Sequence, residues 1–364
     1  MKPSIPILSI TMLMYILIPS IPSTARPSHP HAATHPHSPS IPSSSSALTL
    51  IPPHPHSIPL SPPHGTRYSS FSNGGLALIP PLSHSALASG FSLPDSIPHA
   101  TFTYKTIQNL IILPVTINDS IHVNLILDTG CRNLVLFGKR FQNMFNYQNG
   151  RKIQFSGLGS GKPIEGRLSL DNAVSINVAV GKQIPIVVVP NKNLFAMYSD
   201  VHGVIGYDLL TKFEIELNPV LHRITLRPAA TAQLANTYTH VPIRIEDSRP
   251  LIDCKVIFSS EYSQLCNLML DTGSSLGLLL KTSELKQYPF APQKRILGRG
   301  LNGSLSGIRT VTERLQLNGI EMTSLETGII YSPWHNYASL GMDVLKQYAL
   351  VLNYCKEYAG FRKL

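Results

Sequence analysis

Two Asp-Thr-Gly triplets contain the residue types in this chain that are best suited to catalysis. One begins at Asp128 and the other at Asp271, and each directly follows an apolar segment, NLIL in the first case and NLML in the second. A strand that ends in a carboxylate and a nearby glycine presents the acid at a tight turn, where neighbouring backbone can approach closely. If two such loops face each other, their carboxylates cannot both ionise. The pair can then act as general base toward a water and general acid toward a leaving amine.

The triplets belong to an internal repeat that keeps three landmarks in the same order. NLILDTG, ending at Gly130, recurs as NLMLDTG, ending at Gly273; FSGLGSG is matched by ILGRGLNG; and HGVIGYDLL, around Gly206, is matched by YASLGMDVL, around Gly341. The offset falls from 143 residues (273 minus 130) to 135 (341 minus 206), as loop trimming would produce. We therefore expect two homologous halves. Their ranges are 101–235 and 236–364.

The segments that must position these residues have a β-type pattern. TFTYKTIQNLIILPVTIN and IHVNLILDTG flank the turn residues Asp119 and Ser120, which predicts a hairpin whose second strand ends at Asp128. Helical segments are few and short, and the clearest are 206–213 and 341–348. The expected fold class is all-β, mainly β with a few short helices, arranged as two homologous lobes.

The first 100 residues differ in composition from the rest of the chain. An apolar run interrupted by Pro6 and Pro19 and followed by PSTA predicts an export signal at 1–25, with an uncleaved membrane anchor as the alternative. Residues 26–100 are rich in Pro, Ser and His and predict a disordered spacer, because such a segment cannot bury enough apolar surface to offset its ordering entropy. The alternative for the spacer is weak metal capture. Its candidate ligands are His29, His31, His35, His37, His54 and His56.

Composition and spacing argue against several classes of site. The formal net charge is +10, but no run of Lys and Arg of the kind found in nucleic-acid-binding arms occurs, so no nucleic acid partner is expected. The four cysteines have no CxxC or CxxH spacing, which gives no support for metal binding or thioredoxin-like chemistry. No GxSxG or HExxH motif occurs, so a serine or zinc hydrolase has no support either. Cys254 and Cys266 fall on the two arms of the hairpin expected to enter Asp271. A disulfide and two reduced cysteines both fit that position.

Taken together, these motifs resemble the aspartic proteases that include retropepsins and pepsins. The likeness is to the bacterial two-lobed form, in which a retropepsin-like unit is duplicated within a single chain. The resemblance implies a pepsin-like bilobal acid protease fold, in which Asp128 and Asp271 hold and activate the lytic water.

The same resemblance implies roles for the residues around the two acids. The residues that would support the active loops are Thr129, Gly130, Cys131, Thr272, Gly273 and Ser274. Ser274 would donate a hydrogen bond to Asp271, whereas the matching Cys131 has a thiol, which is a weaker donor. The elements that would brace the loops are Ile205 with Gly206 and Leu340 with Gly341. The flap hairpins that would close over substrate contain the glycines Gly157, Gly159, Gly161, Gly298, Gly300 and Gly303.

The resemblance therefore implies an aspartic-type endopeptidase. Its substrate would be a peptide or protein bound in extended conformation, without a metal or other cofactor. We expect a monomer, periplasmic or secreted and open to cell-surface association, with no stable transmembrane span after signal cleavage. Two alternatives remain open: a catalytically silent peptide-binding module, which the unusual Cys131 favours, and a His-rich metal-handling surface protein with an accessory β domain.

Overall fold

The computed structural model describes residues 12–13, 89–147, 152–158, 161–190, 195, 198, 200–282, 294–331 and 337–364. The predicted signal peptide and spacer lie outside the described residues, apart from 12–13 and 89–100. The described residues are mainly β, as predicted, with two short α-helices, α1 (Tyr207–Leu210) and α2 (Met342–Leu345), and a 3₁₀ turn at Lys139–Phe141. Both α-helices lie at the predicted places but last a single turn, because strands resume at Phe213 and Tyr348.

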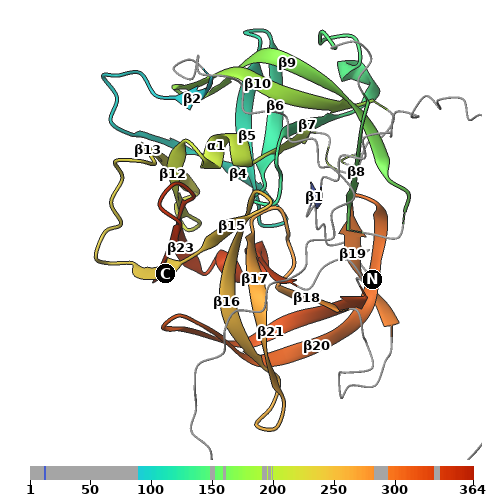
Figure 1. Cartoon of the computed structure of the whole chain (residues 1–364), viewed down its shortest axis with the longest axis vertical. Coiled ribbons are helices and arrows are strands. Elements are labelled where there is room, and N and C mark those ends of the chain that lie inside the picture. The colour runs from blue at the N-terminus through green and yellow to red at the C-terminus, as the bar shows by residue number, and fades with distance from the viewer. Residues whose placement is uncertain are drawn as a thin grey trace, which may run out of the picture. The chain divides into compact units, whose positions relative to one another are not determined.

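The first half forms a ten-stranded sheet (Figure 1, teal to green). Its central strands are β4 (Lys105–Ile107), β5 (Leu110–Ile117), β6 (Ile121–Leu127), β7 (Leu134–Phe137), β8 (Lys152–Gly157), β9 (Ile164–Ile176), β10 (Ala179–Val189) and β11 (Gly203–Ile205). They lie in the order β8-β9-β10-β7-β11-β6-β5-β4, with β1 (Met12–Leu13) beside β8 and β2 (Gly90–Ser92) beside β10. The predicted hairpin is present, since β5 and β6 pair antiparallel around the turn that contains Asp119 and Ser120.

The second half repeats this topology in an eight-stranded sheet (Figure 1, orange). Its strands are β15 (Arg244–Glu246), β16 (Arg249–Ile257), β17 (Ser263–Asp271), β18 (Leu278–Thr282), β19 (Lys294–Gly300), β20 (Gly303–Leu317), β21 (Ile320–Tyr331) and β22 (Tyr337–Gly341). Their order, β19-β20-β21-β18-β22-β17-β16-β15, matches that of the eight central strands of the first sheet. The repeat read from the sequence is thus also a repeat of strand order.

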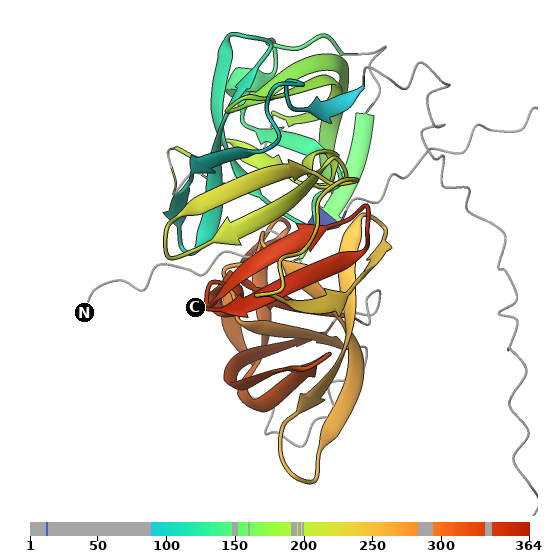
Figure 2. The ribbon, with the colours of Figure 1, turned by 90° about the vertical axis from the view of Figure 1, so that its left-hand side faces the viewer.

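A third sheet of six strands takes three strands from each half. The first half supplies β3 (Ala100–Thr103), β12 (Phe213–Asn218) and β13 (Arg223–Pro228), and the second supplies β14 (Thr239–Pro242), β23 (Tyr348–Asn353) and β24 (Tyr358–Lys363). The order is β14-β24-β23-β12-β13-β3, so the two halves meet at the antiparallel pair β12 and β23. Figure 2 shows these strands side by side, β12 and β13 in yellow-green and β23 and β24 in red.

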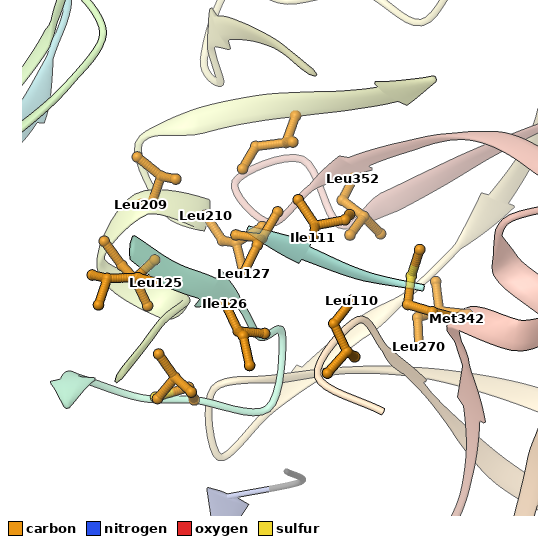
Figure 3. Packing of buried hydrophobic residues seen from close by; sticks show 14 of the residues in the cluster. Leu110, Ile111, Leu125, Ile126, Leu127, Leu209, Leu210, Leu270, Met342 and Leu352 are labelled. Atoms are coloured by element: carbon orange, nitrogen blue, oxygen red, sulfur yellow. The ribbon is translucent and has the colours of Figure 1, made fainter. Parts of the chain in front are cut away.

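The core lies directly behind the two Asp-Thr-Gly loops. Leu125 and Leu127 of β6 are fully buried and pack with Leu209 and Leu210 of α1, and Leu270 of β17 belongs to the same cluster (Figure 3). Burial of one leucine side chain contributes about 1.5–3 kcal/mol. The apolar residues that precede each triplet therefore anchor the loop that follows.

Strand β2 lies inside the range 26–100 that the sequence assigns to the spacer. It pairs antiparallel with β10, and Phe91 at its centre is buried against the first-half core. A single aromatic residue between Ser and Gly gives no strand signal by itself, so the sequence places the start of the ordered sheet too late. The ordered part of the first half begins by Gly90.

Candidate active site

Each Asp-Thr-Gly loop leaves the end of a strand that a parallel neighbour holds in place. Strand β11 pairs with β6, placing Ile205 beside Leu127, and the Asp128 amide donates to the Ile205 carbonyl at 2.8 Å. In the second half β22 pairs with β17, placing Leu340 beside Leu270. Of the residues predicted to brace the loops, Ile205 and Leu340 therefore lie directly beside the strands that end in the two acids.

The bracing glycines permit a backbone contact that a side chain would block. A Cβ atom on Gly206 would lie 2.0 Å from the Asp128 carbonyl oxygen and 2.6 Å from that of Cys131. A Cβ atom on Gly341 would lie 2.2 Å from the Leu276 carbonyl oxygen. Only glycine lets the chain pass behind each loop at this distance.

The two threonines join the loops through four reciprocal hydrogen bonds. The Thr129 amide donates to Thr272 Oγ1 at 3.1 Å, and the Thr272 amide donates to Thr129 Oγ1 at 3.0 Å. The Thr129 hydroxyl donates to the Leu270 carbonyl at 2.6 Å, and the Thr272 hydroxyl donates to the Leu127 carbonyl at 2.8 Å. Both threonines are fully buried. The structure therefore brings together two loops that lie 143 residues apart in the sequence.

The two carboxylates occupy the buried space between these loops. Oδ1 of Asp128 accepts a hydrogen bond from the Gly130 amide at 2.7 Å, and Oδ1 of Asp271 accepts one from the Gly273 amide at 3.1 Å. A Cβ atom on Gly273 would lie 2.3 Å from Cγ of Asp128, so the first carboxyl group lies against the second loop. Both aspartates have no exposed surface.

The surroundings of Asp128 favour its protonated form. Burial, followed by the negative charge of Asp271, raises the pKa of Asp128 well above its usual range, while the Gly130 amide and the charge of Arg249 act in the opposite direction. Among the described residues, Oδ2 of Asp128 has no hydrogen-bond partner. A buried carboxyl whose proton is stabilised by a second carboxylate has the chemistry of a shared-proton pair.

The residues after the two triplets differ in their contacts. The buried Cys131 thiol donates to the Asn133 carbonyl at 2.7 Å, and burial followed by the charge of Asp128 raises the pKa of this thiol well above its usual range. Ser274 Oγ accepts a hydrogen bond from the Leu276 amide at 3.3 Å. Each residue thus stabilises the turn of its own loop, and the hydroxyl bond from Ser274 to the Asp271 carboxylate stays a prediction.

Three buried polar residues near the pair have no signal in the sequence. The Tyr354 hydroxyl donates to the Thr129 carbonyl at 3.3 Å. Arg249 is buried at the start of β16 and forms an ion pair with Asp247 at 2.7 Å. Burial lowers the pKa of Lys281 in β18 to about 8, although the charge of Asp271 acts in the opposite direction. None of the three belongs to a motif or to a matched position of the repeat.

The predicted glycine-rich hairpins are present as β8 with β9 and β19 with β20. Gly157 ends β8 and Gly161 precedes β9, while Gly159 lies outside the described residues. In the second hairpin Gly298 and Gly300 lie in β19, and Gly300 pairs with Gly303 across the turn. Gly303 has φ of 113°, a conformation that other residues rarely adopt.

Two further acids, Asp208 and Asp343, lie at the starts of α1 and α2. Asp343 is half exposed and forms an ion pair with Lys346 at 2.7 Å. Asp208 is half-buried at the start of α1, and burial of its carboxyl group raises its pKa to about 7, with the Leu134 amide and Arg132 acting in the opposite direction. Within the described part of the chain, no group of three or more His, Cys, Asp or Glu residues could hold a metal ion.

Comparisons with known proteins do not assign this site to a family. A scan against models of protein families finds no match to this chain, and a search of curated proteins also finds none. No helix among the described residues is long and apolar enough to cross a membrane.

Proposed function

We propose that the protein is an aspartic endopeptidase that hydrolyses peptide bonds with a water activated by Asp128 and Asp271. The observation that carries the proposal is the reciprocal bonding of Thr129 and Thr272, which brings the two acid loops together. The identical strand order of the two halves supports the same proposal, because a duplicated unit delivers one carboxyl from each copy. The likeness to retropepsins and pepsins, in a pepsin-like bilobal form, is part of this proposal.

The chemistry follows from one proton shared by two carboxyl groups. The ionised carboxylate accepts a proton from the attacking water, and the protonated one provides the acid that the leaving amine needs. The raised pKa of Asp128 keeps a proton on the pair at a pH where an exposed aspartate would be ionised. Cleavage should follow a bell-shaped pH profile bounded by the two apparent pKa values of the pair.

An extended peptide is the substrate that the hairpin β8–β9 fits. The outer edge of β8 pairs antiparallel with a short strand, Met12 lying beside Gly157 and Leu13 beside Ser156. An edge that accepts one extended segment offers main-chain hydrogen bonds to another. If the export signal is cleaved after residue 25, β1 is lost and this edge becomes accessible. The same predicted export signal supports our proposal that the mature enzyme lies outside the cytoplasm, in the periplasm or secreted.

Single substitutions in the pair test the proposal. Asp128→Asn and Asp271→Asn should each abolish cleavage of a random peptide library almost as fully as the double substitution, because either change removes the shared proton. Asp343→Asn is a matched control, since it neutralises a half-exposed acid at the start of α2 and should leave cleavage unchanged. Substantial turnover by either folded single variant would refute the proposal.

The rival function is a peptide-binding module that retains the site without catalysis. Cys131 is the feature that favours this function, because it has a thiol where the second loop has the hydroxyl of Ser274. That thiol donates to the Asn133 carbonyl. A statine-containing peptide, whose hydroxyl group mimics the tetrahedral intermediate, separates the two. An enzyme should bind it and be inhibited, whereas a silent module would bind peptides of the library and release them intact.

A further inference from the structure

The tips of the two glycine-rich hairpins meet at one residue. Asn302 lies in the turn between β19 and β20 and is only 4% exposed. Its main-chain amide donates to the Leu158 carbonyl at 3.0 Å, and its carbonyl accepts from the Gly161 amide at 2.6 Å. Both partners belong to the tip of the first hairpin, so main-chain bonds join the two tips in each direction.

The side chain of Asn302 makes three more hydrogen bonds to the same tip. Oδ1 accepts from the Gly157 amide at 2.8 Å. Nδ2 donates to the Lys162 carbonyl at 2.6 Å and to the Gly161 carbonyl at 3.3 Å. All four polar groups of this residue, two from the main chain and two from the side chain, therefore bond to the opposite hairpin. A buried asparagine with every group paired is a specific connection rather than a chance contact.

Glycines make this approach possible on both sides. A Cβ atom on Gly161 would lie 2.1 Å from the Asn302 carbonyl oxygen, and one on Gly300 would lie 2.1 Å from the Leu158 carbonyl oxygen. The repeat gives Asn302 the counterpart Gly161 in the first half (302 minus 141). The two tips are thus unequal, because the second half supplies the side chain and the first half supplies the backbone groups that it binds.

We infer that Asn302 is a latch that holds the two hairpins together and controls the entry of substrate to the site. The latch follows from the hydrogen bonds alone, and its effect on substrate rests on the proposed function. In the proposed enzyme, a polypeptide would bind between the hairpins and the acid pair, and separation of the tips would admit it from the side. Asn302 is a positioning residue, since it acts through the hairpins and not on the reacting atoms.

An amide is suited to this position because it offers an acceptor and two donors at once. In Asn302→Asp, the group that replaces Nδ2 is an oxygen that would face the carbonyls of Gly161 and Lys162. When the carboxyl is protonated it can still donate one hydrogen bond, and when it is ionised it repels both carbonyls. The Asp variant should therefore convert a latch that does not respond to pH into one that opens as pH rises.

Amide hydrogen exchange tests the latch without relying on catalysis. The measurement uses the full chain carrying Asp128→Asn, to prevent self-cleavage, alone and combined with Asn302→Ala, Asn302→Asp or Asn318→Ala. Asn318 is the control, because it lies in another turn of the same sheet and makes one exposed bond, to the His240 carbonyl at 3.4 Å. With Asn302→Ala, exchange of the Gly157 and Gly161 amides should accelerate at least about tenfold, since opening no longer breaks the side-chain bonds.

The two variants of Asn302 must agree. With Asn302→Asp, the same amides, corrected for intrinsic exchange rates, should be protected at low pH and lose protection as pH rises, while the control stays unchanged. Unaltered exchange at Gly157 and Gly161 in folded Asn302→Ala protein would overturn the latch, as would an Asp variant that shows no pH dependence.

Binding kinetics of a statine-containing peptide supply the second readout, measured with Asp128 restored. Loss of the latch should raise both the association and the dissociation rate constants, and dissociation should rise more because the closed hairpins retain the peptide. Cleavage by Asn302→Ala should show an increased KM with little change in kcat. Faster exchange in a protein that neither cleaves nor binds the peptide would leave the latch standing and remove the proposed function. Normal cleavage by Asn302→Ala with unaltered amide exchange would overturn the latch and leave the proposed function in place.

Discussion

Replacement of Thr129 by valine tests whether the threonine bonds position the acid pair. Valine keeps the shape of the side chain but removes a hydroxyl that donates to the Leu270 carbonyl at 2.6 Å and accepts from the Thr272 amide at 3.0 Å. Two buried hydrogen bonds are lost, and the Thr272 amide loses that acceptor. At about 0.5–1.5 kcal/mol for each bond and about 1–3 kcal/mol for a buried group left unpaired, the free energy of unfolding should fall by about 2–6 kcal/mol.

The activity should fall by more than the stability alone would cause. The bonds that Thr129 makes join the loops of Asp128 and Asp271, and a displacement of about 1 Å between catalytic groups can reduce the rate about 100-fold. Urea unfolding gives the stability, and peptide cleavage under conditions where the variant remains folded gives kcat. Thr272→Val removes the other two of the four bonds and should behave in the same way. The double variant should cost less than the sum of the two, because both residues join the same pair of loops.

Thr312→Val is the matched control for this pair. Thr312 is equally buried, and its hydroxyl is hydrogen-bonded to that of Thr327 at 2.7 Å, within the sheet of the second half. Loss of this hydroxyl in Thr312→Val should reduce the free energy of unfolding and leave kcat unchanged. The reasoning would be refuted if Thr129→Val kept the stability and kcat of the parent protein, or if Thr312→Val reduced kcat as much.

Three further predictions concern residues outside the acid pair. Because the pKa of Asp208 is raised to about 7, the folded protein keeps a proton that the unfolded chain loses above about pH 4. The free energy of unfolding should therefore fall as pH rises from about 4 to about 7, and Asp208→Asn should reduce this pH dependence in urea titrations. Cys254 and Cys266 face each other across β16 and β17 with their Sγ atoms 3.2 Å apart, so oxidised glutathione should convert them to a disulfide. Mass spectrometry would detect this as the loss of both thiols, and persistence of both thiols in folded protein would contradict the prediction. Deletion of residues 1–97 should lower the melting temperature relative to deletion of 1–88, because it removes the buried Phe91; equal melting temperatures would show that β2 adds no stability.

Local sequence signals were sufficient for the fold class and for the position of the two acids. Each triplet follows an apolar strand, and a strand buried by its neighbours must deliver its last residue to the same end of the sheet. The short helices at Gly206 and Gly341 were predicted for the same reason, since a glycine followed by an amphipathic turn is a local pattern. Both sheets could therefore be anticipated in outline from one half and its repeat.

Pairing between distant segments could not be read in this way. The bonds from Tyr354 to Thr129 and from Asn302 to the first hairpin depend on how the two halves dock, and no spacing within one half encodes that. The same is true of Arg249 and Lys281, whose burial near the pair is a consequence of tertiary packing. Charged residues on strands usually face solvent, so the sequence alone favours exposed positions for Arg249 and Lys281, whereas both are buried.

The sheet that the two halves share has a consequence for the order in which the protein can fold. Strand β12 is complete when little more than half of the chain has been synthesised, but its partner β23 begins only at Tyr348. Until then β12 presents an unpaired edge, with the buried side chains of Phe213, Ile215 and Leu217 uncovered. An exposed apolar edge can recruit other strands, and contacts between such distant segments form slowly. A first half made without β23 and β24 is therefore expected to aggregate more readily than the whole chain.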